Sequence, residues 1–327
     1  MIVDNHITHL YPPVHGGVSD YVDVCRSLDP QSQPCFLDHQ SAITTPLTGH
    51  CLLHYSGYGY AKRGAPLWLL NKIKQDRPHI KTLGVFFHEL YAFGPPWSSS
   101  FWLSPVQQHI ARRLAEIADY WLTNREGSGQ WLQRFAGNKP HVVLPIFSTV
   151  GEMPSYSTNR TNKVVVFGGA ALRQATYDAA GEALFSWIQA QGMTLHDIGP
   201  PMHDPALSTA LEHTGAIVHG RLAPEEVSKL LADAAFGMVT YPVNYVAKSS
   251  VFAAYCAHRV CPILISKHYA PSDQLTAGQH YWAGVPAVNV QQDKLKEIGQ
   301  AAWEWYQPHR LVRHIEVLKT LAQGNLR

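Results

Sequence analysis

"HGRLAPEEVSKLLADAAFGMVTYP", residues 219–242, decides how this chain folds. Pro224 and the two glutamates after it are typical of the first turn of a helix. Proline brings no N–H that would need a partner there, and acidic groups favour the positive end of a helix. The apolar run FGMVTYP that follows predicts a buried strand. This helix-to-strand step is one unit of an alternating α/β fold.

The alternation extends in both directions from this stretch. Residues 246–263 predict a turn, a helix and a buried strand, and KVVVFGG at 163–169 predicts a strand that ends in glycines. Upstream, four apolar runs separated by helical patterns predict strands: 50–56, 81–89, 118–124 and 141–147. The polar segment 150–163 has no periodicity and predicts a linker. We therefore expect two doubly wound parallel α/β domains with a ligand cleft beyond the carboxyl ends of their strands.

Composition excludes several classes of protein. The 26 Lys and Arg balance 24 Asp and Glu, without the basic excess of a nucleic-acid surface, so we expect no nucleic-acid partner. Five cysteines without a CxxC pair argue against a disulfide framework or a zinc knuckle, and HELYA at 88–92 is not the HExxH metal motif. We expect no metal site. Free cysteines, the absence of a signal sequence and the absence of a run of ~18 apolar residues predict a cytoplasmic protein.

Two motifs follow predicted strands of the first half. In PPVHGGVSDY, residues 12–21, Gly16 and Gly17 allow close approach of a ligand to backbone N–H groups at a helix start. A tight strand-to-helix turn explains the same residues. In FFHEL, residues 86–90, His88 lies where the strand ends and is a candidate for binding a sugar hydroxyl. The alternative is a loop histidine that caps a local carbonyl.

Two motifs of the second half are candidate anion sites. FGGAALR, residues 167–173, places Gly169 and Arg173 at a helix start, and the planar arginine side chain fits phosphate oxygens. In KSSV, Lys248 adds a positive charge to a helix start at Ser249 and Ser250. A surface arginine and an ordinary capped helix are the structural alternatives.

The loop YAFGPPWSSSFWLSP, residues 91–105, is rich in aromatic residues. Aromatic rings stack on sugars and also lie at membrane interfaces, so this loop is a candidate for a sugar acceptor, a lipid carrier or a peripheral membrane contact. Packing beneath the following helix is the alternative. A membrane contact would place the protein at the inner face of the membrane.

The motifs at 12–21, 86–90, 123–126, 167–173, 219–242 and 248–259 occur in an order that resembles the retaining, family 4-like GT-B glycosyltransferases. The resemblance spans nearly the whole chain. It implies two Rossmann-like domains facing across a cleft, an acceptor domain at 1–155 and a nucleotide-sugar domain at 160–302. It also implies that a tail helix at about 303–327 packs back on the first domain. The implied activity is transfer of a sugar from a nucleoside-diphosphate sugar to an acceptor, with retention at the anomeric carbon. The chain has no Asp-x-Asp motif for a metal ion, so we expect a metal-independent reaction. We expect UDP-glucose or a similar hexose donor, and a polysaccharide or other glycoconjugate as acceptor.

The resemblance also implies roles for individual residues. Gly16 and Gly17 match the loop beside donor and acceptor, and His88 matches the histidine beside the donor sugar. The remaining matches lie in the second domain: Gly169 and Arg173 at the diphosphate, Arg221 and Leu222 at the base, and Lys248, Ser249, Ser250 and Val251 beneath the phosphates. No cofactor is implied beyond the nucleotide sugar itself.

Two departures from the family pattern keep other functions open. The usual Glu-x7-Glu pattern is missing, and its second position falls near Ala253 or Ala254; no lysine follows Arg173 as it usually does. The alternatives are a sugar-nucleotide 2-epimerase of the same fold and a non-catalytic protein that binds sugar nucleotides.

Overall fold

The computed structural model describes residues 6–13, 16–41, 46–153, 160–287 and 292–324. The chain divides into an N-terminal unit, Met1–Pro145 with Leu311–Arg327, and a C-terminal unit, Ile146–Arg310. The C-terminal segment belongs to the first unit again from Leu311 onward. The expected linker lies near the division between the units. Its residues 154–159 are outside the described part of the chain, and Thr161 already begins a strand.

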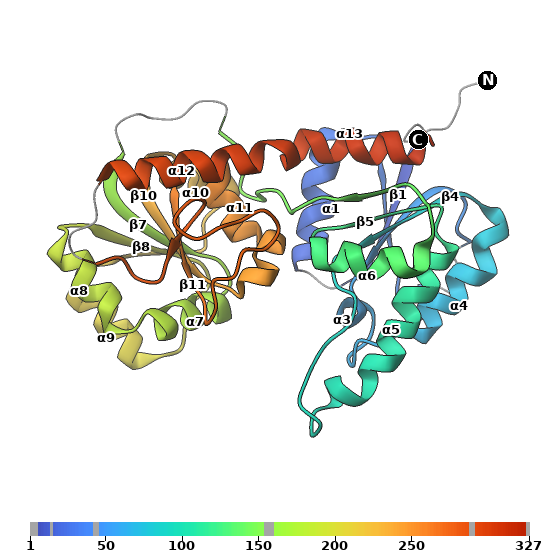
Figure 1. Ribbon diagram of the computed structural model, residues 1–327, viewed down its shortest axis with the longest axis horizontal. Helices are drawn as coiled ribbons and strands as arrows, with labels where there is room; N and C mark the ends of the chain where they lie inside the picture. The colour runs from blue at the N-terminus through green and yellow to red at the C-terminus, as the bar shows by residue number, and fades with distance from the viewer. Residues whose placement is uncertain (1–5, 14–15, 42–45, 154–159, 288–291, 325–327) are drawn as a thin grey trace. The chain divides into compact units, whose positions relative to one another are not determined.

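The N-terminal unit is built on a parallel sheet with the strand order β2-β1-β3-β4-β5-β6 among its described residues (Figure 1). The strands are β1 (Ile7–Tyr11), β2 (Gln33–Phe36), β3 (Gly49–Tyr55), β4 (Ile80–Phe87), β5 (Tyr120–Thr123) and β6 (His141–Val143). The helices are α1 (Gly17–Leu28), α3 (Gly57–Tyr60), α4 (Leu67–Asp76), η1 (Arg77–His79), α5 (Ser99–Ile117), α6 (Glu126–Ala136) and α13 (Leu311–Ala322).

Alternating residues of the strands bury two different layers. One face carries Leu53, Val85 and Phe87, which pack with side chains of α4, α5 and α6 in one apolar cluster. The opposite face carries His9, His54 and Phe86, and α1 packs over it through Tyr21. The period of two along a strand therefore separates an apolar layer from one rich in histidine.

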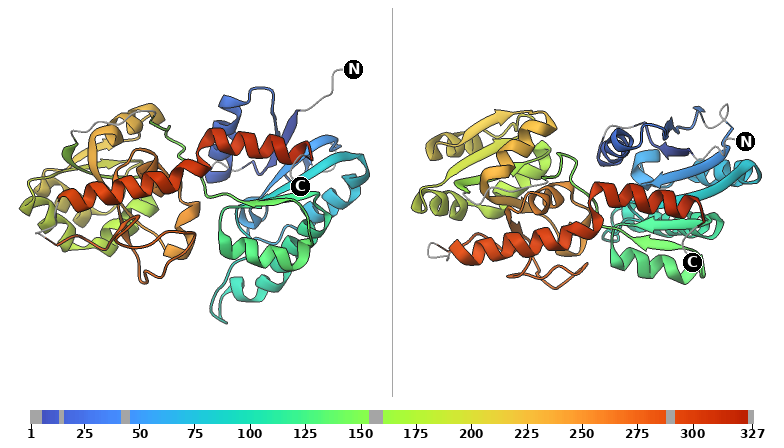
Figure 2. Two further views of the ribbon diagram at one scale, coloured as in Figure 1. Left: turned by 45° about the horizontal axis from the view of Figure 1, so that its top comes forward. Right: turned by 90° about the horizontal axis from the view of Figure 1, so that it is seen from above.

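The C-terminal unit has a second parallel sheet, and its described strands lie in the order β12-β11-β10-β7-β8-β9. Figure 2 shows the ribbon of this unit from two further directions. The strands are β7 (Thr161–Phe167), β8 (Thr194–Ile198), β9 (Ile217–Gly220), β10 (Ala234–Thr240), β11 (Cys261–Ile265) and β12 (Trp282–Ala283). The helices are α7 (Ala170–Ala180), α8 (Glu182–Ala190), α9 (Pro205–Thr214), α10 (Pro224–Asp233), η2 (Val243–Lys248), α11 (Ser250–Ala257), α12 (Gln292–Tyr306) and η3 (Gln307–His309).

The core of this unit explains why the predicted strands are almost wholly apolar. One cluster joins strand residues such as Val164 and Met238 to helices α7, α8, α9 and α12. On the other face, the ring of Tyr255 in α11 packs where a Cβ on Gly237 would collide with it. Strands covered on both faces cannot alternate between polar and apolar residues. The predicted fold class, two Rossmann-like doubly wound sheets, is confirmed.

Candidate functional site

Each sheet reverses its strand order at one point. In the C-terminal unit, β8 and β9 continue outward from β7 on one side, whereas β10, β11 and β12 extend on the other. The connections from neighbouring strands β7 and β10 therefore leave in opposite directions. Such a switch point opens a crevice at the carboxyl ends of the two strands, where ligands of open α/β sheets bind. In the N-terminal unit the corresponding point lies between β1 and β3.

A row of glycines follows the carboxyl ends of β7, β8 and β9. Gly168, Gly199 and Gly220 have φ angles of 128°, 152° and 70°. The N–H of Gly168 donates to Ile198 O (3.1 Å), and that of Gly199 donates to Gly220 O (2.8 Å). A Cβ on Gly199 would collide with the carbonyl oxygen of Gly168. Because these three glycines have no side chains, a ligand can approach the backbone closely along this edge, and we call them the glycine strip.

Gly169 was predicted from the sequence, whereas Gly199 and Gly220 were not. Each of these strands ends at or directly before a glycine, in FGG, DIGP and HGR, and this repeat along the chain was the available signal.

The starts of α7 and α11 meet at the same edge. Gly169 is the N-cap of α7, and Ser249 is the N-cap of α11, where its hydroxyl accepts from Phe252 N–H (3.2 Å). A Cβ on Gly168 would lie 3.3 Å from Cγ2 of Val251, so the first turn of α11 packs against the turn that enters α7. First-turn N–H groups have no partner within their helix, and two such ends together favour an anion.

Lys248 is the last residue of η2 and directly precedes the N-cap of α11. Its side chain is half-buried, with Nζ 5.5 Å from the centre of the Tyr245 ring. Ser249 is buried and its hydroxyl serves the helix cap, so it would contribute to a site through the helix start. Ser250 is half-buried and Val251 is buried. These residues place a positive side chain next to the converging helix ends.

Arg173, expected from the sequence at a diphosphate, is buried inside the C-terminal unit. Its side chain is only 1% exposed. The guanidinium pairs with Asp197, donates to Pro200 O and donates to Gly168 O (3.1 Å from Nε). Asp197 lies 24 residues further along the chain, on β8, which pairs with the strand that leads into α7. Sequence spacing did not reveal this partner. Arg173 thus stabilises the backbone at Gly168 and Pro200 through hydrogen bonds from the interior of the unit.

The residues expected at the nucleotide base lie further along this edge. Arg221 is exposed and directly follows Gly220 at the end of β9, and Leu222 is half-buried. Ala253 and Ala254 are buried inside the unit, so α11 supplies no carboxylate to a ligand from these positions.

In the N-terminal unit, Gly16 and Gly17 form the exposed start of α1. The N–H of Gly16 donates to Ser19 Oγ (2.9 Å), and the Ser19 hydroxyl donates to Gly16 O (2.8 Å). A Cβ on either glycine would meet nothing within 4 Å, so packing of the described residues does not require glycine here. Val14 and His15 of the same motif lie outside the described residues.

His88 is the last of three hydrogen-bonded histidines from neighbouring strands. His9 Nδ1 lies 2.8 Å from His54 Nε2, and His54 Nδ1 lies 3.0 Å from His88 Nε2. His88 directly follows β4, and its side chain is buried at 9% exposure. The ring of Tyr21 packs edge-on against it. Nε2 of His88 is thus hydrogen-bonded to His54.

Burial keeps the first two rings neutral. It lowers the pKa of His9 to about 4, an effect only partly opposed by the charge of Asp29. Burial also lowers the pKa of His54 well below its usual value, and the neighbouring imidazoles add to this effect. A neutral imidazole has one N–H, so His54 donates to one neighbour and accepts from the other. The tautomer of His88 is therefore linked to that of His9.

Comparison with solved structures identifies the architecture. The lipopolysaccharide outer core galactosyltransferase WaaB matches with a TM-score of 0.55 and 11% identity, over 98% of this chain and 100% of that chain. A candidate UDP-N-acetylglucosamine 2-epimerase from Listeria monocytogenes matches with a TM-score of 0.58 and 11% identity, over 98% and 97%. S. aureus TarM matches with a TM-score of 0.55 and 12% identity, over 83% and 55%.

The chain has the GT-B fold. The structural resemblance expected from the sequence motifs is thereby confirmed at the level of the fold. No protein-family model matches the sequence, and no curated protein matches it significantly. The chain spans 55% of TarM and 59% of the matching chain in the GtfA/B complex.

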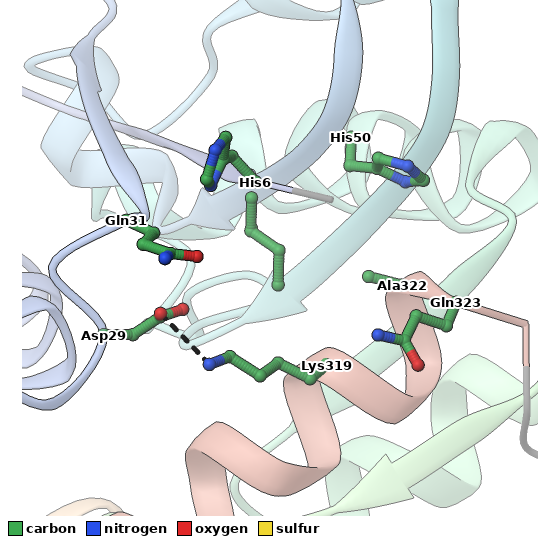
Figure 3. A pocket seen from close by; sticks show the side chains of 8 residues that line it. His6, Asp29, Gln31, His50, Lys319, Ala322 and Gln323 are labelled. Atoms are coloured by element: carbon green, nitrogen blue, oxygen red, sulfur yellow. Dashed lines mark ion pairs between the residues drawn. The ribbon is translucent and has the colours of Figure 1, made fainter. Parts of the chain in front are cut away.

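A separate pocket of about 210 Å³ in the N-terminal unit lies at the amino ends of β1 and β3 (Figure 3). His6 and Ile7 at the start of β1 line it together with His50 at the start of β3. Lys319 of α13 and Asp29 form an ion pair of 3.0 Å beside it. Because it lies at the amino ends of the strands, we do not assign it to the candidate site.

Within the described ranges, no group of three or more His, Cys, Asp or Glu side chains is placed to hold a metal ion. No helix in the described part of the chain is long and apolar enough to cross a membrane.

Proposed function

We propose that this protein is a retaining glycosyltransferase that uses a nucleoside-diphosphate sugar as donor. The observation that carries the proposal is the meeting of the α7 and α11 starts beside Lys248, at the β7–β10 switch point. Two helix ends and a lysine suit a ligand with adjacent phosphates. The acceptor is a polysaccharide, another glycoconjugate or a lipid-linked sugar.

The chemistry explains the need for positive charge at this place. Breaking the bond between sugar and diphosphate leaves negative charge on the β-phosphate, which must be stabilised where it develops. A helix end contributes about 0.3–1 kcal/mol, up to ~2 when partly buried. Lys248 therefore supplies the larger share, and the reaction needs no metal ion in this scheme. Arg173, expected from the sequence to share this role, is buried in its ion pair with Asp197 and leaves it to Lys248.

The sugar-binding part of the proposal rests on His88, Gly16 and Gly17. In a retaining reaction of this class, the acceptor hydroxyl attacks from the side of the leaving group, and the departing phosphate takes its proton. His88 then orients the donor sugar and does not act as a base. Its link to His54 supports this role because a tethered ring keeps one orientation.

For the donor we propose a UDP-hexose such as UDP-glucose, with Gly169 beside the diphosphate and Arg221 and Leu222 beside the base. Ser249, Ser250 and Val251 hold the phosphates through the start of α11. Since Ala253 and Ala254 are buried, backbone groups take the place of the missing carboxylate at the ribose.

A donor panel tests the proposal. Thermal unfolding is measured with UDP, GDP and ADP sugars, and the correct donor raises the Tm because ligand binding stabilises the folded state by RT ln(1 + [L]/Kd). The donor identified is then incubated with an acceptor panel, and products are separated by mass. Stabilisation by a UDP sugar, followed by a glycosylated acceptor that keeps the donor's anomeric configuration, is the expected result. No stabilisation by any nucleotide sugar contradicts the proposal.

A 2-epimerase is the second candidate, favoured by the match of the Listeria monocytogenes protein over 98% of this chain. It needs no acceptor, so a change in the sugar nucleotide incubated alone with the protein would establish it. Binding of the donor without either reaction would establish a non-catalytic binding protein.

A further inference from the structure

Four large aromatic side chains stand exposed at one end of the N-terminal unit. Phe93 is 72% exposed, Trp97 86%, Phe101 44% and Trp102 71%, and we call them the aromatic tip. They lie on the segment before α5 and in the first turn of that helix. Figure 1 shows this segment and the start of α5 projecting beyond the rest of the unit. The stretch expected to be a loop over 91–105 is therefore helical from Ser99 onward.

Local hydrogen bonds hold the aromatic tip in its exposed position. The indole N–H of Trp102 donates to Pro96 O (2.8 Å), and the hydroxyl of Ser98 accepts from Phe101 N–H (3.3 Å) as the N-cap of α5. Tyr91 supports the ring of Phe93 by edge-on contact, with ring centres 5.0 Å apart. Exposing this much apolar surface costs free energy, so a fixed tip points to a partner that buries it.

Two exposed cations belong to a loop that is tied to the base of the tip. Lys62 and Arg63 are exposed, and Gln107 ties their loop to the base of the tip. Its side chain donates to Arg63 O (3.0 Å) and accepts from Ala92 N–H (2.7 Å). Neither residues 57–75 nor residues 90–115 include an Asp or Glu. The surface combines exposed Trp and Phe with cations.

We infer that the aromatic tip, with Lys62 and Arg63, docks on an anionic phospholipid bilayer. Trp side chains prefer the boundary between headgroups and hydrocarbon, and basic residues nearby are attracted to anionic headgroups. A pocket of about 370 Å³ beside the tip, lined mainly by apolar residues that include Phe93, Trp102 and Pro105, offers space for hydrocarbon. A second copy of this chain is a poorer occupant because a symmetric contact would bring like charges together. The inference does not depend on the transfer reaction.

Flotation with vesicles tests the inference. Vesicles of equal parts phosphatidylcholine and phosphatidylglycerol should carry the full chain to the top of a density gradient, and added salt should weaken this binding. Vesicles of phosphatidylcholine alone should carry much less. The variant Trp97→Ser/Trp102→Ser should lower partitioning roughly tenfold, and Lys62→Ala/Arg63→Ala should lower it to a similar extent on the anionic vesicles only.

Two control variants change exposed residues elsewhere. Ile217→Ser/Val218→Ser removes exposed apolar groups of β9, and Lys229→Ala/Lys296→Ala removes exposed cations. Both should float as the wild type does, and Tm measurements should show all four variants folded. Wild-type protein that stays at the bottom overturns the inference, as does a tryptophan variant that floats normally. A dimer in solution that is lost in the tryptophan variant, without vesicle binding, assigns the tip to a second copy instead.

Discussion

Asp197 at the end of β8 and Arg173 in the first turn of α7 form an ion pair in which both side chains are only 1% exposed. The second carboxylate oxygen of Asp197 accepts from the hydroxyl of Tyr177 (2.8 Å). Burial, reinforced by the charge of Asp197, raises the pKa of Tyr177 well above its usual value. The pair therefore belongs to a buried network beneath the glycine strip.

This pair predicts that Arg173→Ala acts on stability. Removing one partner of a buried ion pair leaves an uncompensated charge, and the free energy of unfolding should fall by roughly 3–5 kcal/mol. Urea denaturation monitored by circular dichroism measures this change. Arg134→Ala removes an exposed arginine and should leave the stability nearly unchanged. If Arg173→Ala is as stable as the wild type but turns over more than about tenfold slower, the arginine contacts substrate after all.

Lys248→Ala should lower turnover more than tenfold, about 1.4 kcal/mol of barrier, because it removes positive charge beside the helix ends. It should also weaken the binding of UDP, measured by calorimetry. Lys229→Ala removes an exposed lysine of α10 and serves as the control. Turnover near the wild-type value in Lys248→Ala would contradict the proposal that Lys248 stabilises the departing phosphate.

The His54–His88 hydrogen bond predicts a positioning role for His54. His54→Phe keeps a ring of similar shape but removes the hydrogen bonds to His9 and to His88. Turnover should therefore fall about tenfold or more. The affinity for UDP should stay unchanged, because the candidate phosphate site belongs wholly to the C-terminal unit. His54→Gln should recover part of the loss. His39→Phe, at an exposed position, controls for the change in side-chain type. Equal losses of turnover and UDP affinity would indicate general damage to the fold.

His258 predicts a dependence of stability on pH. Its Nδ1–H donates to Ala254 O (2.8 Å), which leaves Nε2 of the neutral ring to accept from the Ser228 hydroxyl (2.7 Å). Burial lowers its pKa from 6.5 to about 4, although the hydrogen bond to Ala254 opposes this shift. The unfolded chain therefore takes up a proton at pH values where the folded chain does not. The contribution of His258 to the free energy of unfolding is complete above pH 6.5 and is lost as the pH falls toward 4. The total loss is about 3 kcal/mol.

Urea unfolding at a series of pH values over this window measures the effect. His258→Asn should show a shallower loss of stability on acidification, whereas His213→Asn, at an exposed position, should follow the wild type. His9 and His309, with pKa values lowered by burial to about 4 and about 3, add to the wild-type slope in the same direction. An unchanged slope in His258→Asn would show that its ring is protonated in the folded protein.

Much of the fold was predictable because strands covered on both faces stand out as apolar runs. β7, β10 and β11 are of this kind, and the glycines at the ends of β7, β8 and β9 mark the candidate ligand edge of their sheet. The short β2, Gln33–Phe36, and the two-residue β12, Trp282–Ala283, were missed because neither is an apolar run of strand length. The start of α5 was missed because Pro105 within the helix resembles a loop residue.

The sequence by itself determined the alternation of strands and helices, and it placed glycines and a lysine where strands end and helices begin. These are local properties, set by periodicity, capping and backbone freedom. Only the tertiary structure decided which side chains are available to a ligand. The parallel pairing of β7 with β8 brings Asp197 to Arg173 in the helix that follows β7. The pairing of β1, β3 and β4 joins His9 to His54, 45 positions apart, and His54 to His88, 34 positions apart. Burial then commits Arg173 to the interior and keeps His9 and His54 neutral, because a charge removed from water needs a partner.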